Sequence, residues 1–190
     1  GYALISKEEE LKINKIITKE KTFLSIVDYI IALTEDTKNL LFSEYKIPLS
    51  SISVIENAVT LSSDFKFVNR ERNEVIKFLF VGRLSKIKGI NELIQAFEIV
   101  NKQFSSFELI IVGNGEEKIK CSSELMSHVT LLDWMDKTNL YDLYRSADVG
   151  LMPSYGEECS FVGIEMMMHG LPIVASNASG LKEMVIDGYN

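Results

Sequence analysis

The sequence has few cysteines, and it lacks both a long hydrophobic run and a leader-like start. Two cysteines, Cys121 and Cys159, are too few for a disulfide framework and favour a reducing cytosolic setting. No apolar run approaches the roughly 18 residues of a membrane-spanning helix, and the first residues lack the basic-then-apolar start of a signal peptide. These absences predict a cytoplasmic protein without a transmembrane segment.

The sequence also lacks an excess of positive charge. It has 20 Lys and Arg against 27 Asp and Glu, which gives a formal net charge of −7. A general nucleic-acid-binding surface needs a basic excess, so we expect no nucleic-acid partner. The acidic balance still permits a small basic pocket for a phosphate group.

The 190 residues leave room for one full domain and part of another. Because the chain begins with Gly1 and stops without an obvious terminal element, we expect a piece of a longer protein. A polar, irregular stretch predicts a linker at 61–76 between two domains. Before it, the pattern predicts helices at 7–20 and 34–45, the second capped by Thr34, and strands at 29–33 and 51–55.

Residues 77–190 alternate short apolar runs with amphipathic stretches. The predicted strands are 78–81, 107–112, 129–132, 148–152 and 172–176. The predicted helices are 89–103, 116–127, 138–147 (opened by Thr138) and 160–170, with a further helix starting at 180. The strands are continuous apolar runs, as in strands that are covered on both faces. This alternation predicts an α/β fold, a Rossmann-like parallel sheet with helices on both faces.

In an open parallel sheet, ligands bind outside the carboxyl ends of the strands, so we examine the segments that follow each strand. The first segment, GRLSKIKG, holds Gly82, Arg83, Lys86 and Lys88 and leads into a helix. A guanidinium fork, a mobile ammonium and free helix amides together suit a diphosphate. The alternative is a solvated basic turn.

The fourth segment, PSYGEECS, leads into a helix that starts near Ser160. Its free amides at 160–162 would face an anion. Glu165 lies about a turn and a half into this helix and can point back to the same pocket, where a carboxylate suits a ribose diol. Glu157 can meet sugar hydroxyls beyond the phosphate. Alternatively, Glu157 is a solvated loop charge and Glu165 a surface helix residue.

The second and third segments are weaker signals. GNGEE has two glycines but no full dinucleotide fingerprint, and we include its Asn114 among the candidate binding residues. DWMD could offer backbone groups to a flat base, with Trp134 or Met135 beside it. The alternative for Trp134 is core packing.

Seven motifs in order resemble the retaining glycosyltransferases of family 4, which have the two-domain GT-B fold. The motifs are DYIIALTE, SVIENAV, FVGRLSKIKG, ELIIVGNGEE, VTLLDWM, LYRSADVGLMPS and EECSFVGIEMMMHGLPIVAS, and the matching stretch runs from about Tyr29 to Asn190. The resemblance implies that 77–190 is the donor-binding domain, truncated at its C-terminal end. It also implies that 1–60 is the C-terminal remnant of the acceptor-binding domain, most of which, including a histidine near the reacting centre, precedes this chain.

The resemblance also implies roles for single residues. Arg83 and Lys88 match the pair that neutralises the donor diphosphate, and the backbone at Met135 matches the one that holds the base. Glu157 matches the glutamate near the donor sugar, and Glu165 the one on the ribose. The turn that holds the distal phosphate corresponds to Ser160, Phe161 and Val162. The family usually has an aromatic-glycine pair where Cys159 and Ser160 stand here, and we expect the Ser160 hydroxyl to cap the helix.

The implied reaction moves a sugar from a nucleoside diphosphate to an acceptor hydroxyl with retention of configuration, in polysaccharide or glycoconjugate synthesis. Glu157, Arg83 and Lys88 would be the catalytic residues. No cofactor or metal is expected, since the chain has no Asp-any-Asp motif. The acceptor would be a glycan or a lipid-linked molecule, which leaves open a peripheral contact with the inner membrane surface. The alternatives are a GT-B nucleotide-sugar epimerase and a non-catalytic nucleotide-binding module.

Overall fold

The computed structural model describes residues 7–60 and 74–189. The chain divides into two compact units, Gly1–Glu56 and Asn57–Asn190. Most of the predicted linker, at 61–73, lies outside the described residues. No helix of the described part of the chain is long and apolar enough to cross a membrane.

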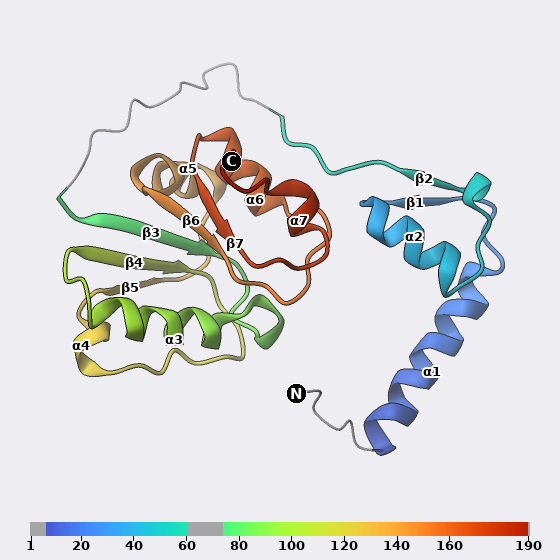
Figure 1. The fold of residues 1–190 in the computed structure, drawn as a ribbon, viewed down its shortest axis with the longest axis horizontal. Coiled ribbons are helices and arrows are strands. Elements are labelled where there is room, and N and C mark those ends of the chain that lie inside the picture. The colour runs from blue at the N-terminus through green and yellow to red at the C-terminus, as the bar shows by residue number, and fades with distance from the viewer. Residues whose placement is uncertain (1–6, 61–73, 190) are drawn as a thin grey trace. The chain divides into compact units, whose positions relative to one another are not determined.

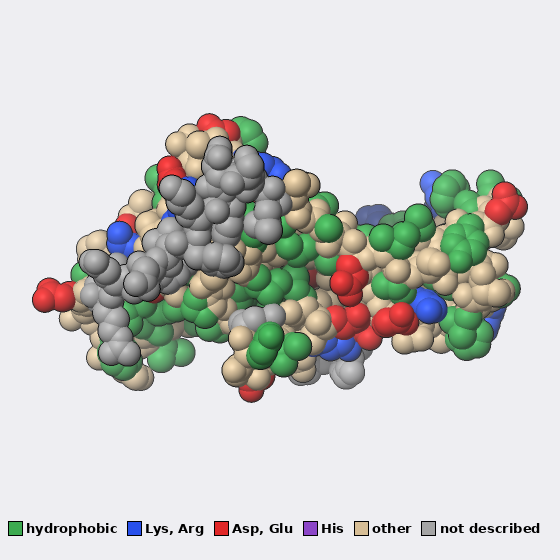
Figure 2. Space-filling view, turned by 90° about the horizontal axis from the view of Figure 1, so that it is seen from above, with side chains coloured by type: hydrophobic (Ala, Val, Ile, Leu, Met, Phe, Trp, Pro, Cys, Tyr) green, Lys and Arg blue, Asp and Glu red, His purple; other side chains and the backbone are tan. Residues whose placement is uncertain are grey.

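The first unit has two helices and two short parallel strands. In chain order these are α1 (Lys7–Leu24), β1 (Ile30–Ala32), α2 (Glu35–Ser43), the short 3-10 turn η1 (Leu49–Ser51) and β2 (Ile52–Val54). As predicted, Thr34 caps α2, because its Oγ1 accepts a hydrogen bond of 3.1 Å from the amide of Thr37. Among the residues of this unit that the structure describes, the buried hydrophobic core consists of Ala32, Leu41 and Ile52. Large hydrophobic side chains such as Ile26 and Ile31 are exposed, and Figure 2 shows apolar side chains across this unit's surface.

The second unit is built on a five-stranded parallel sheet. Its strands are β3 (Ile76–Val81), β4 (Phe107–Val112), β5 (Val129–Leu132), β6 (Val149–Met152) and β7 (Ile173–Ala175). Their spatial order is β5-β4-β3-β6-β7, and every neighbouring pair is parallel. The predicted α/β fold with a parallel sheet is confirmed.

Helices cover both faces of this sheet (Figure 1). One face carries α3 (Ile90–Asn101) and α4 (Ser123–Met126), and the other carries α5 (Lys137–Ser146), α6 (Phe161–Met168) and α7 (Leu181–Met184). A 3-10 turn, η2 (Lys86–Lys88), precedes α3.

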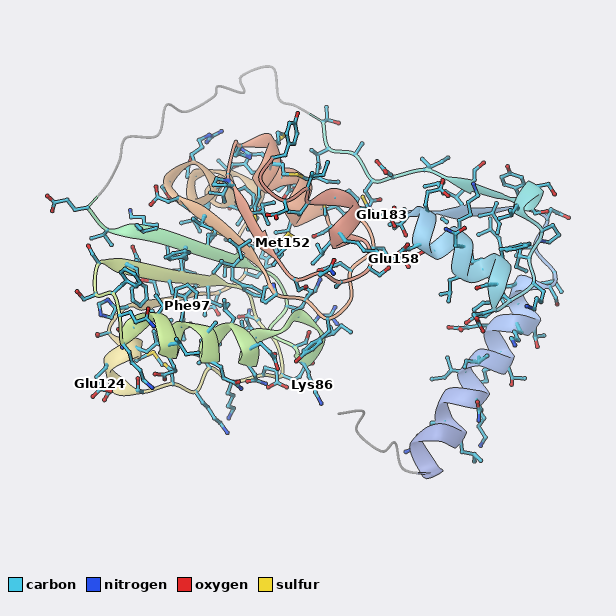
Figure 3. The ribbon with its side chains drawn as sticks, in the orientation of Figure 1. Lys86, Phe97, Glu124, Met152, Glu158 and Glu183 are labelled. Atoms are coloured by element: carbon cyan, nitrogen blue, oxygen red, sulfur yellow. The ribbon has the colours of Figure 1, made fainter. Side chains whose placement is uncertain are left out.

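The core follows the alternation of side chains along the strands. On β4, Leu109 and Ile111 pack in the cluster under α3, where Phe97 also lies (Figure 3). Their neighbour Ile110 packs in the opposite cluster, under α5 and α6. Burial on both faces explains why these strands are continuous apolar runs.

Two predicted helix starts are wrong. The helix predicted at 116–127 is only α4, because the amide and the hydroxyl of Ser122 both donate to the carboxylate of Glu98 (2.6 and 2.9 Å) and Ser122 caps the helix there. The helix α5 is opened by Asp136 rather than Thr138, because Asp136 Oδ1 accepts from the amide of Asn139 at 3.0 Å. The strand β3 begins at Ile76, two residues before its predicted start.

The strand order creates a topological switch point. After β3 the chain moves outward through β4 and β5, and it then returns to the other side of β3 with β6. The loops after β3 and β6 therefore leave the sheet side by side but in opposite directions, which opens a crevice at its carboxyl edge.

Candidate functional site

The loops after β3 and β6 are in direct backbone contact at the switch point. The amide of Tyr155 donates to the carbonyl of Ile87 at 2.8 Å. Gly89 has φ 69°, and a Cβ atom there would lie 2.1 Å from the carbonyl oxygen of Pro153. Only glycine permits this approach. In Figure 3, Lys86 and Glu158 lie at the end of the sheet to which the strands point, whereas Glu124 lies at the opposite end.

Lys88 and Glu157, which the sequence predicts to act on the same donor, contact each other across these loops. Lys88 Nζ donates to Glu157 Oε1. Ser154 Oγ donates to the same oxygen at 3.2 Å, and its side chain is buried. The Glu157 side chain is only 13% exposed, so this is not the solvated loop charge of the alternative reading.

A pocket of about 360 Å³ opens beside this pair at the carboxyl edge of β3, β4 and β5. Five of the predicted binding residues line it: Gly82, Arg83, Asn114, Met135 and Val162. Its walls are largely apolar, and Trp134 and Leu140 complete them. Trp134 is 76% exposed, which excludes core packing and leaves an indole at the pocket.

Two glycines form part of this pocket. A Cβ atom on Gly113, whose φ is 135°, would lie 2.0 Å from the carbonyl oxygen of Gly82. The loops after β3 and β4 therefore pack backbone against backbone, which leaves open space where side chains would otherwise stand. Arg83 is exposed here, and its guanidinium forms no ion pair or hydrogen bond with another residue of the described ranges, so its side-chain donors are available to a ligand.

The helix α6 begins where the sequence predicts. Ser160 is its N-cap, and its Oγ accepts from the amide of Gly163 at 3.4 Å. The predicted capping role of this hydroxyl is confirmed. Phe161 is half exposed and Val162 lines the pocket, so the first turn of α6 borders it. The first amides of a helix have no acceptor within the helix and can bind an anion.

Glu165 is buried between α5 and α6 and does not line the pocket. Only 4% of the residue is exposed, so it is not a surface helix residue. The hydroxyl of Tyr144 donates to Glu165 Oε2 at 3.1 Å, and Lys137 Nζ lies 3.5 Å from Oε1. Lys137 opens α5 directly after the loop that carries Trp134 and Met135. One carboxylate oxygen of Glu165 therefore lies near the carboxyl edge of the sheet, and the other faces the core.

The loop after β7 packs against the segment between β6 and α6. Ser176 Oγ donates to the carbonyl of Ser154, and a Cβ atom on Gly180 (φ 81°) would lie 2.0 Å from the carbonyl oxygen of Glu158. From the other side, Asn57 Nδ2 donates to the carbonyl of Cys159 at 2.6 Å. The segment between β6 and α6 is thus held on both sides.

Sequence reasoning missed several residues of this region. Tyr144 and Lys137 were not predicted, since only the packing of α5 on α6 brings them to Glu165. Ser85 was also missed. It is buried in the loop after β3, and its Oγ has no hydrogen-bond partner among the described residues. Its position between Arg83 and Lys88 in the sequence was the available signal.

The described residues contain no cluster of three or more His, Cys, Asp or Glu side chains that could hold a metal ion. The charged groups at the crevice include the cations Arg83, Lys88 and Lys137 and the carboxylates of Glu157 and Glu165. This set suits an anionic ligand that also carries hydroxyl groups.

The geometry can be compared with known proteins. The family model described as "Glycosyl transferases group 1" matches residues 62–190. An uncharacterized glycosyltransferase of Methanocaldococcus jannaschii is 30% identical over 205 residues, covering 100% of this chain and 52% of the relative. The chain spans about half the length of the curated relatives it matches.

Solved structures show the same fold. The apo form of the lipopolysaccharide outer core galactosyltransferase WaaB superposes with a TM-score of 0.70 at 23% identity, over 86% of this chain and 47% of that one. Anabaena Alr3699/HepE, solved in complex with UDP and glucose, superposes with a TM-score of 0.64 at 21% identity, over 86% and 48% of the two chains. The fold is therefore that of GT-B glycosyltransferases, of which this chain resembles about half.

Proposed function

Because this chain belongs to the glycosyl transferases group 1 family, we propose that its second unit binds a nucleoside diphosphate sugar at the crevice between β3 and β6. The whole protein would transfer that sugar to an acceptor hydroxyl. The observation that carries this proposal is the meeting of Lys88 and Glu157 at the switch point, beside the pocket that Arg83 and Val162 line.

Each part of a nucleotide sugar has a matching group at the crevice. The flat base fits the largely apolar pocket beside Trp134 and Met135. The diphosphate would lie between Arg83, Lys88 and the first amides of α6. Glu157 lies beyond it, where the sugar hydroxyls would be. Aromatic stacking on a base is typically worth about 1–3 kcal/mol, so an exposed indole at such a pocket is a suitable contact.

The same groups account for catalysis. When the bond between sugar and diphosphate breaks, negative charge grows on the leaving group. Cations and helix amides that are already in place stabilise that charge without reorganising. Arg83 and Lys88 would act in this way, and Glu157 would hold both Lys88 and the sugar. We propose transfer with retention of configuration, in polysaccharide or glycoconjugate synthesis, without a metal.

The Lys88–Glu157 contact has a consequence for binding. Lys88 is held next to a carboxylate rather than extended into solvent. A diphosphate adds a second anion on the other side of the ammonium, and an ammonium with three donors can serve both. The pair therefore presents the cation to the phosphate at little cost in side-chain entropy.

Calorimetric titration tests donor binding. UDP is the first ligand, followed by GDP, ADP and the corresponding monophosphates. We expect one diphosphate to bind the chain at least about tenfold more tightly than its monophosphate, because the second phosphate gains charge-assisted hydrogen bonds. Equal binding of the diphosphate and the monophosphate would contradict the proposed diphosphate site.

A transfer assay tests the division of labour. With a nucleotide sugar and a glycan or lipid-linked acceptor, we expect the chain alone to bind the donor and to transfer nothing, because it spans only about half of its relatives. Sugar transfer by this chain alone would contradict that expectation. Conversion of the nucleotide sugar without any acceptor would instead indicate an epimerase.

A further inference from the structure

Each carboxylate oxygen of Glu165 has its own partner, and the two partners differ in burial. The partner of Oε2 is Tyr144, which is fully buried. The partner of Oε1 is Lys137, whose side chain is 75% exposed. One oxygen therefore has a fixed partner in the core, and the other has a mobile partner in solvent.

The Tyr144 hydroxyl is held rigidly. Its ring packs with the rings of Tyr141 and His169, with centroid distances of 6.2 and 5.4 Å. The imidazole of His169 is itself fixed, because its Nδ1 lies 2.8 Å from the carbonyl oxygen of Glu165. Burial, and secondarily the charge of Glu165, raises the pKa of Tyr144 well above its usual range. The hydroxyl thus stays protonated and keeps donating at any physiological pH.

Lys137, in contrast, is easily displaced. An ion pair that involves a mostly exposed lysine contributes little, because water screens it and the long side chain loses entropy. A ligand hydroxyl that approaches Oε1 from the carboxyl edge of the sheet can therefore replace or share this contact.

We propose that Tyr144 is a positioning residue that fixes Glu165 so that its Oε1 edge receives the ribose hydroxyls of the bound nucleotide. This inference rests on the proposed function, since it assumes a nucleotide at the crevice. A carboxylate offers about four lone-pair positions. Tyr144 occupies one of them on Oε2 and leaves the others for the pentose diol.

The hydroxyl of Tyr144 matters because the carboxylate would otherwise be free to turn. Without it, Glu165 can rotate about its last side-chain bond and offer both oxygens to Lys137. The two ribose hydroxyls would then approach a carboxylate that has no fixed orientation and whose oxygens both contact Lys137. The loss should fall on the ribose contact and leave the base and diphosphate contacts unchanged.

A tyrosine that only fills the core would behave differently. Its substitution would lower the free energy of unfolding, and it would weaken the binding of ribonucleotides and deoxyribonucleotides by the same factor. The ratio between the two dissociation constants separates a positioning role from a packing role.

The experiment compares UDP with 2′-deoxy-UDP, and GDP with 2′-deoxy-GDP, by calorimetry. The variants are Tyr144→Phe and the matched control Tyr141→Phe, which removes a hydroxyl from the same helix where no contact with Glu165 occurs. We expect the wild-type chain and Tyr141→Phe to prefer the ribo form. We expect Tyr144→Phe to lose about tenfold or more of that preference, the usual effect of one hydrogen bond to a charged group.

Lys137→Met is a second variant whose folding is not in question, since the altered side chain is exposed. It should keep or raise the preference for ribose, because it removes only the competitor for Oε1. A preference that falls in Lys137→Met, or that survives in Tyr144→Phe, overturns the inference and leaves the donor site intact. A wild-type chain that binds both forms equally overturns the role of Glu165 and this inference with it. A wild-type chain that binds no nucleotide overturns the proposed function.

Discussion

At the scale of single residues, the site depends on charges that are paired before any ligand arrives. Lys88 contacts Glu157, and Lys137 contacts Glu165. The Glu157 carboxylate is mostly buried and would be costly without a partner, so Lys88 also stabilises the folded chain. Lys88 is at the same time a group that the diphosphate of an anionic donor would contact.

Replacing Lys88 tests this double role. We expect Lys88→Met to weaken the binding of UDP by about tenfold or more, because one charge-assisted contact with the diphosphate is lost. It should also lower the free energy of unfolding by about 1–3 kcal/mol, because Glu157 is left mostly buried without its partner. Calorimetry and denaturant unfolding measure the two effects.

Lys102→Met is the control for the change in charge. Lys102 is exposed just after the end of α3, at the opposite edge of the sheet. Lys102→Met should leave both the affinity for UDP and the free energy of unfolding nearly unchanged. Equal weakening of UDP binding by the two variants would show that overall charge, rather than the crevice, attracts the nucleotide.

At the scale of elements, the crevice exists because two loops approach each other as closely as backbones can. Gly89 ends η2 and begins α3, and it touches Pro153 of the loop after β6. Gly180 makes the same kind of approach from the loop after β7. These glycines set the distance between the groups that would bind the donor.

Gly89 and Gly170 have nearly the same backbone conformation but different surroundings. Comparing them therefore separates the cost of that conformation from the cost of a steric clash. Gly89 has φ 69° and Gly170 has φ 67°, but a Cβ atom on Gly170 meets nothing within 4 Å. We expect Gly170→Ala to lower the free energy of unfolding by about 1–2 kcal/mol, because alanine disfavours the left-handed conformation. Gly89→Ala should cost clearly more, about 3 kcal/mol or above, because the carbonyl of Pro153 must also move.

Denaturant unfolding of the two variants gives the comparison. Because Gly89→Ala also displaces Lys88, it should weaken UDP binding, whereas Gly170→Ala should not. Equal losses of stability in the two variants would mean that the loops can separate without cost, contrary to the close contact described above.

The elements themselves could be predicted largely from the sequence, and the exceptions have physical causes. The strands of the second unit are buried on both faces, so their apolar runs mark them to within two residues. The start of α4 could not be predicted, because Glu98 of another helix sets it by binding Ser122. Asp136 and Thr138 are both good caps, and local sequence does not choose between them.

The sequence could predict where the residues of the candidate site lie, but not which side chains they contact. The rule for carboxyl ends of parallel strands located Arg83, Lys88, Glu157 and Glu165. The structure places the first three in the loops or the short turn that follow β3 and β6, and Glu165 in the second turn of α6. The contact of Glu165 with Tyr144 joins two residues 21 positions apart in the chain, and it depends on how their helices pack. No spacing in the sequence encodes that contact.

At the scale of the whole molecule, the two units contribute unequally. Every candidate binding residue lies in the unit Asn57–Asn190. In its described part, the unit Gly1–Glu56 has a core of three buried hydrophobic residues and a sheet of two strands, which is marginal for independent stability. Because the candidate binding residues all belong to the second unit, we expect a donor that binds at the crevice to leave the first unit unaffected.

Hydrogen–deuterium exchange of the chain with and without UDP tests the central claim most directly, because it reports on all segments at once. We predict slower exchange at 82–89, 133–136 and 157–165 in the presence of UDP, and unchanged exchange at 11–56. Protection confined to 11–56, or to the loops at the opposite edge of the sheet such as 102–106, would contradict a nucleotide site between β3 and β6.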